Sequence, residues 1–195
     1  ETWYYANGSG AMLTGWQFLG GAWFYLGANG AMVSSDWSYI NGAWYYFDEN
    51  GHMLTGWLDL GTEENHQWYY LKASGAMQTG WQNIGGEKYY FASDGVMRTG
   101  FQDISGARYY FDADGAMHYG FLNLNGDTYY LNDQGKMVKS WQKLNGQNYY
   151  FNASGVMQTE WQMIGGKLYY FGYDGAMQKN KEVFCYYDSE HWGNY

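Results

Sequence analysis

The sequence predicts an all-β protein, a solenoid of tandem β-hairpin repeats of about 20 residues each. Three observations lead to this prediction. Methionine recurs at a nearly constant interval, aromatic residues make up 23% of the chain, and 29 glycines occur with no proline. Because the aliphatic residues that fill one large core are sparse, many small packing units are expected instead. The periodic methionines are Met12, Met32, Met53, Met77, Met97, Met117, Met137, Met157 and Met177.

An aromatic residue follows most of these methionines by four or five positions and marks the first strand of each repeat. A second aromatic cluster, such as 44–47 or 68–71, marks the second strand. One repeat is longer, and its extra residues fall around Gly61 to Asn65, between two expected strands, where they lengthen a turn. The first-strand aromatics are Trp16, Trp37, Trp57, Trp81, Phe101, Phe121, Trp141 and Trp161.

Each repeat has the pattern of a hairpin. Residues 81–84 form a first strand, Gly85-Gly86 a turn and 89–91 a second strand. Asn-Gly occupies the same turn in other repeats, because both dipeptides tolerate the positive φ angles of a two-residue turn. No helical pattern is present. The Asn-Gly turns are Asn41-Gly42, Asn125-Gly126 and Asn145-Gly146.

Alternation along the second strand divides its aromatic side chains between two faces. Trp44 and Tyr46 share one face, and Tyr45 and Phe47 share the other. A single hairpin is marginal in water, so the hairpins must bury aromatic faces on each other. We expect the middle tyrosine and the following Phe or Leu to form this core, which leaves the other face for a ligand.

Composition excludes several functional classes. The net charge of −9 leaves no cationic cluster for nucleic acid. No apolar run approaches the roughly 18 residues of a membrane span. The histidines are scattered and Cys185 is the only cysteine, so neither a metal site nor an internal disulfide is expected. No pair of carboxylates has the arrangement of a glycosidase active site, so no enzyme activity is expected. No cofactor is expected. Because 2–5 read as the middle of a repeat, we expect an upstream segment, for which a signal peptide and a catalytic domain remain open.

The repeats resemble the choline-binding modules that attach surface proteins and wall hydrolases to choline-bearing teichoic acids. Residues 51–57, Gly-His-Met-Leu-Thr-Gly-Trp, and Trp68-Tyr69-Tyr70 carry the resemblance, which covers nearly the whole chain. It implies a ligand between consecutive hairpins, held by the first-strand Trp, the Trp of Trp-Tyr-Tyr and the second Tyr of the next repeat. The implied cages are Trp16, Trp23 and Tyr46; Trp37, Trp44 and Tyr70; and Trp57, Trp68 and Tyr90, with Met32, Met53 and Met77 near their floors.

The resemblance also implies a partner and a location. The partner is choline or phosphocholine of cell-wall teichoic acids, and the protein is secreted and bound to the bacterial cell wall. A quaternary ammonium is recognised by ring faces, each contributing roughly 0.5–2 kcal/mol, so one cage should bind in the millimolar to micromolar range. Several cages on one chain raise the avidity about 100-fold or more. Choline-dependent homodimerisation remains open.

The later repeats depart from this pattern. We therefore divide the array into choline-type repeats over 1–91 and degenerate repeats over 92–180, with an atypical C-terminal cap over 181–195. The later repeats resemble those of clostridial toxins and glucan-binding domains, so carbohydrate binding is the alternative to a purely structural role. Gln82, Gln102, Gln142 and Gln162, beside the first-strand aromatics, suit either reading. The position of the first Trp in Trp-Tyr-Tyr is taken by Lys88, Arg108, Thr128, Asn148 and Leu168, and Phe101 and Phe121 replace the first-strand Trp.

Overall fold

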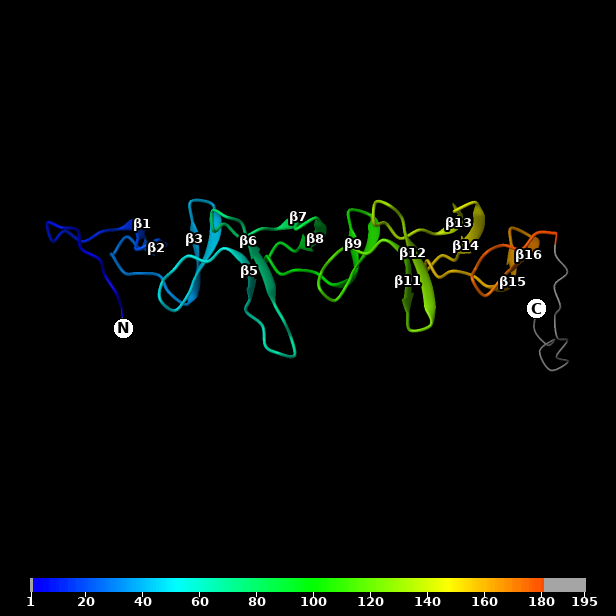
Figure 1. Ribbon diagram of the computed structural model, residues 1–195, viewed down its shortest axis with the longest axis horizontal. Coiled ribbons are helices and arrows are strands. Elements are labelled where there is room, and N and C mark those ends of the chain that lie inside the picture. Colours follow the sequence, from blue (N-terminus) through cyan, green and yellow to red (C-terminus); the bar gives the residue numbers. More distant parts are fainter. Residues whose placement is uncertain (1, 181–195) are drawn as a thin grey trace. The chain divides into compact units, whose positions relative to one another are not determined.

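The computed structural model describes residues 2–180, and in that range it contains strands and turns but no helix. The sixteen strands form eight antiparallel hairpins, numbered 1–8 here in chain order. Figure 1 labels strands and colours the chain from blue at the N-terminus to red toward the C-terminus. The first strands are β1 (Gly15–Leu19), β3 (Asp36–Ile40), β5 (Gly56–Asp59), β7 (Gly80–Ile84), β9 (Gly100–Ile104), β11 (Gly120–Leu124), β13 (Ser140–Leu144) and β15 (Glu160–Ile164). The second strands are β2 (Ala22–Leu26), β4 (Ala43–Phe47), β6 (Trp68–Leu71), β8 (Glu87–Phe91), β10 (Ala107–Phe111), β12 (Asp127–Leu131), β14 (Gln147–Phe151) and β16 (Lys167–Phe171).

The predicted hairpins and their turns are confirmed. Ile40 pairs with Ala43 across Asn41 and Gly42, whose φ angles are 50° and 89°. Two consecutive positive φ angles define the type I′ turn, which matches the twist of antiparallel strands. In hairpin 3, β5 ends at Asp59 and β6 begins at Trp68, so the insertion does lengthen a turn.

The core repeats with the hairpins. The last residue of each second strand, the expected Phe or Leu, is buried, and Phe47 and Phe91 are fully so. That residue also forms an isolated bridge to the periodic methionine, as in Phe47 with Met53, so each repeat is a hairpin followed by a short returning segment. Many small cores therefore replace one large interior.

The chain divides into two compact units. The first extends to Gln102 and includes Tyr110–Met117, and the second comprises Asp103–Tyr109 and the described residues from His118 onward. All three predicted aromatic cages fall in the first unit. The expected cap over 181–195 lies outside the described residues.

Candidate functional site: aromatic junctions between hairpins

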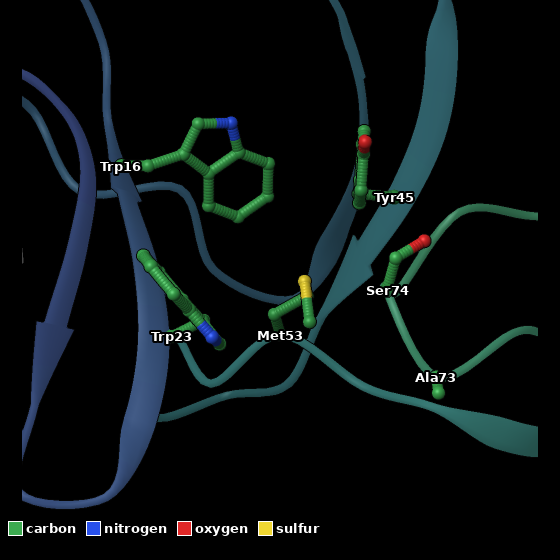
Figure 2. A pocket seen from close by; sticks show the side chains of 6 residues that line it. All are labelled: Trp16, Trp23, Tyr45, Met53, Ala73 and Ser74. Atoms are coloured by element: carbon green, nitrogen blue, oxygen red, sulfur yellow. The ribbon is translucent and has the colours of Figure 1, made fainter.

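The first junction, between hairpins 1 and 2, holds an open cavity of about 340 Å³. The residues around it are Trp16, Trp23, Tyr45, Met53, Ala73 and Ser74. Figure 2 shows the two tryptophans on one side, Tyr45 and Ser74 across from them, and Met53 between. The cavity is lined mainly by ring faces and edges and holds no charged side chain.

Strand alternation decides which rings meet there. Trp16 and Tyr25 are direct cross-strand partners, and Trp23 lies two positions before Tyr25, so all three share the face of hairpin 1 toward hairpin 2. Hairpin 2 presents its opposite face, which carries Tyr45 and Phe47. Trp16 stands edge-on to Trp23 at 6.2 Å between ring centroids and lies 4.9 Å from Tyr45.

Met53 is held at the cavity by the backbone of two hairpins. Its amide donates to the carbonyl of Trp23 at 2.8 Å, and the neighbouring Leu54 amide donates to Tyr46 at 2.9 Å. Its side chain lies against Gly75 in the turn after hairpin 3. The junction is therefore built by three successive repeats.

Parts of this arrangement recur at the next two junctions. At the second, Trp37 and Tyr69 are 5.0 Å apart between ring centroids. At the third, Trp57 stands edge-on to Trp68 at 6.2 Å and lies 5.0 Å from Tyr89. The amides of Met77 and Met97 each donate at 2.8 Å to the carbonyls of Trp44 and Trp68, respectively.

The structure differs from the sequence-based cages at the tyrosine. Tyr46 does not join Trp16 and Trp23; it packs 5.2 Å from Trp37 of its own hairpin, on the face toward hairpin 3. Tyr70 and Tyr90 lie likewise against Trp57 and Trp81, at 5.2 and 5.0 Å. The reason is strand alternation, because the second tyrosine shares a face with the Trp of its own strand and so points away from the preceding hairpin.

The methionines at the junctions lie one repeat later than expected. Met32 was expected below the first cage, but its amide donates to Trp3 at 2.9 Å, and it lines an upstream cavity of about 540 Å³ with Trp3 and Phe24. Met53 and Met77 belong to the first and second junctions, and Met97, absent from the expected set, to the third.

The second-strand tryptophan at each of the three junctions, Trp23, Trp44 or Trp68, packs against a further ring. The cross-strand partner of Trp23 is Phe18, at 5.2 Å, and that of Trp44 is Tyr39, also at 5.2 Å. In hairpin 3, His66 of the inserted turn takes this place 6.0 Å from Trp68, with its Nδ1 bonded to Asp59. A two-residue turn fixes cross-strand partners, so the positions of Phe18 and Tyr39 could have been read from the sequence.

Carboxylates lie near two of the three cages. Asp94 and Asp114 occupy, one and two repeats later, the turn position held by Ser74 at the first junction. Burial, with the negative charge of Asp94, raises the pKa of Tyr69, and burial with Asp114 and Glu87 raises that of Tyr89. The protonated phenols are favoured in the folded protein, so the stability they contribute below the ordinary pKa is lost as the pH rises through the raised values.

Asp94 is also paired with Arg98 at 3.6 Å. The carboxylate expected to strengthen cation binding is therefore Asp114, near the third junction. We expect Asp114→Asn to lower the affinity of the third junction for a quaternary ammonium ion by about two- to fivefold at low ionic strength, and by less at high ionic strength. Calorimetric titration at two salt concentrations checks this. Glu63→Gln, the same charge change in the exposed inserted turn, is the matched control. An equal loss of affinity in both variants would show that the net charge of the protein, and not the local carboxylate, causes the effect.

The later repeats retain the hairpins but lack the second-strand tryptophan found at Trp23, Trp44 and Trp68. Thr128 donates to Asn123 across hairpin 6 at 2.6 Å, and Arg108 pairs with Asp103 at 3.8 Å. The glutamines beside the first-strand aromatics donate their side-chain amides to backbone carbonyls three residues earlier, at 2.8–2.9 Å. These amide nitrogens are thus engaged in the local turn, which accounts for their recurrence without a ligand.

Two further observations concern residues 2–180 only. No cluster of three or more His, Cys, Asp or Glu side chains there is arranged to hold a metal ion. No helix in this range has the length and apolar character needed to cross a membrane.

Known protein families match nearly all of the chain. The choline-binding repeat matches over residues 35–79, 78–117, 98–140, 119–158 and 138–181, and a cell wall binding repeat matches 1–12 and 14–32. The chain belongs to the choline-binding repeat family. This confirms the predicted resemblance, and a choline-binding repeat array is a binding module rather than an enzyme.

Solved structures agree with this assignment of the choline-binding repeats. CbpJ from Streptococcus pneumoniae TIGR4 is 32% identical with a TM-score of 0.82, covering 93% of this chain and 72% of that one. Choline binding protein F from Streptococcus pneumoniae, with a peptidoglycan analogue, is 34% identical (TM-score 0.77; 93% and 71% covered). The modular autolysin LytC of the same species is 28% identical (0.58; 91% and 42%). These likenesses confirm the tandem-hairpin fold. No curated protein sequence matches significantly.

Proposed function

We propose that this array attaches its carrier to the bacterial cell wall by binding choline groups of teichoic acids in the three aromatic junctions. The observation that carries the proposal is the first junction, where three rings from two hairpins surround a cavity of about 340 Å³. A quaternary ammonium has no hydrogen-bond donor and is attracted by ring faces, and these rings stand at right angles or tilted to one another around one space.

The cages assigned by this proposal are Trp16, Trp23, Tyr45 and Met53; Trp37, Trp44, Tyr69 and Met77; and Trp57, Trp68, Tyr89 and Met97. All lie in the first unit, so binding is concentrated in the N-terminal half of the chain. Each site is weak by itself, and a polymer bearing many choline groups engages several at once, which raises the avidity about 100-fold or more. The carrier is secreted and held at the wall by this avidity.

The test is a titration with choline while tryptophan fluorescence is followed. We expect saturable quenching or a spectral shift, with three sites by equilibrium dialysis. The matched control ligand is 3,3-dimethylbutanol, a neutral compound of the same shape, which should bind far more weakly. Walls bearing choline should retain the protein and release it on addition of free choline. Retention on glycans that is indifferent to choline would instead support carbohydrate binding.

The two adjacent tyrosines of hairpin 2 offer a sharper prediction. In a background with Trp44→Ala and Trp68→Ala, which leaves the first junction, we expect Tyr45→Leu to weaken choline binding by about 2- to 30-fold, since one ring wall contributes roughly 0.5–2 kcal/mol. Tyr46→Leu should leave the affinity near that of the background, because Tyr46 faces the next junction. Calorimetry measures both affinities. A larger loss in Tyr46→Leu than in Tyr45→Leu would support the grouping of Tyr46 with Trp16 and Trp23 that the sequence implied.

A further inference from the structure

Hairpin 4 has the indole of a cage but a lysine in place of its second tryptophan. Trp81 occupies the position of Trp16 and Trp57, and it is packed as they are, 5.0 Å from Tyr90 and 5.7 Å from Phe111. The corresponding distances for Trp57 are 5.2 Å to Tyr70 and 5.8 Å to Phe91. The aromatic platform of hairpin 4 is therefore intact.

Lys88 stands where hairpins 1–3 carry Trp23, Trp44 and Trp68. Trp81 and Tyr90 are cross-strand partners, and Lys88 lies two positions before Tyr90, so all three share one face. The carbonyl of Lys88 accepts the Met117 amide at 2.8 Å, as that of Trp23 accepts Met53. The backbone frame of the site is thus preserved around a changed side chain.

The Lys88 ammonium lies over the indole of Trp81, with Nζ 4.7 Å from the ring centroid. This is the geometry in which an indole face attracts a cation. In the proposed cages the same face is offered to the quaternary ammonium of the ligand. Here a cation of the chain itself occupies it, and the covalent tether gives that cation a high effective concentration.

We infer that Lys88 is a built-in occupant of the Trp81 face and the residue that closes this face to choline. This inference rests on the proposed function, because it takes the faces of Trp16, Trp37 and Trp57 as choline sites. The first four hairpins then carry two kinds of Trp face: those of hairpins 1–3, which need a soluble cation, and that of hairpin 4, which is filled by a cation of the chain. Lys88 is accordingly a specificity-determining residue, and the Trp81 face is a latent site for quaternary ammonium ligands.

The test uses the full chain labelled with 5-fluorotryptophan, with Trp81 and Trp57 resolved by fluorine NMR. In the native sequence, choline should shift the Trp57 resonance and leave Trp81 unmoved, with an affinity at Trp81 at least about tenfold weaker. Lys88→Trp, which removes the cation and restores a ring, should make Trp81 respond at choline concentrations within about threefold of those for Trp57. Lys88→Arg keeps a cation and should behave as the native chain.

Lys88→Met keeps the stem without the charge and guards against a misfolded tryptophan variant. It should move the Trp81 resonance before any ligand is added and make it responsive to choline, whereas Lys72→Met, at an exposed turn lysine, should do neither. Equal responses of Trp81 and Trp57 in the native chain, or a folded Lys88→Met in which Trp81 stays silent, would overturn the inference. Failure of the proposed function is distinct, because Trp57 itself would then not respond.

Discussion

Replacing Phe47 by alanine is expected to lower the free energy of unfolding by about 3–5 kcal/mol, the cost of emptying a fully buried aromatic position. Phe47 is 0% exposed, lies 5.8 Å from the ring of Trp16, and forms the bridge that holds Met53. Its loss should loosen both the core between hairpins 1 and 2 and the back of the first cage. Urea unfolding followed by circular dichroism measures the stability, and choline titration measures the cage.

Leucine at the same position is the matched control. Leu71 and Leu131 fill the equivalent sites of hairpins 3 and 6 and are also 0% exposed, so the fold accepts this side chain. We expect Phe47→Leu to cost less than about 1.5 kcal/mol. If alanine and leucine were equally destabilising, contact with the aromatic ring itself rather than filled volume would be the decisive feature.

Gly75→Ala is expected to cost about 2–5 kcal/mol and to weaken the first cage. Gly75 has a φ of 81°, which an L side chain adopts at a cost of about 1–2 kcal/mol. An added Cβ would also lie 2.3 Å from the sulfur of Met53, so that the Met53 side chain must shift at the cavity, at a further cost of about 1–3 kcal/mol. Thermal unfolding and choline titration together measure the two effects.

Gly120→Ala is the control that separates the cost of backbone strain from the cost of the contact with Met53. Its φ is 83°, nearly that of Gly75, but an added Cβ would meet nothing within 4 Å. Gly120→Ala should therefore show only the backbone cost of about 1–2 kcal/mol and unchanged choline affinity at the first junction. Equal losses in the two variants would show that the methionine contact contributes nothing.

The hairpins and their turns could be predicted because their determinants are local. A strand, a two-residue turn and a second strand occupy about 12 consecutive residues, and Asn41-Gly42 encodes its positive φ angles directly. The buried Phe or Leu followed from the same alternation. The short returning segment that ends at Met53 was not predicted, since its bridge to Phe47 has no distinctive sequence signal.

The residues around the first cavity were predicted in part. Trp16 and Trp23 come from one hairpin, and the register of β1 and β2 brings them together. The third wall comes from another hairpin, and the grouping implied by the resemblance chose Tyr46, although alternation places Tyr46 on the far face. Applied to both hairpins at once, the period of two would have selected Tyr45. Strand alternation does not predict that Met53 and Ser74 lie at this cavity, because both come from segments outside the strands.

By itself, the sequence determined the repeat, the hairpin, the buried aromatic positions and the pair of tryptophans on one face of each early hairpin. These depend on interactions within one repeat, where residue spacing dictates side-chain direction. Only the tertiary structure decided that Tyr45, Met53 and Ser74 close the first cavity and that Lys88 lies over Trp81. Contacts between repeats depend on how each hairpin is placed on the next, and the direction of a long, flexible side chain such as that of Lys88 depends on the surface that it meets.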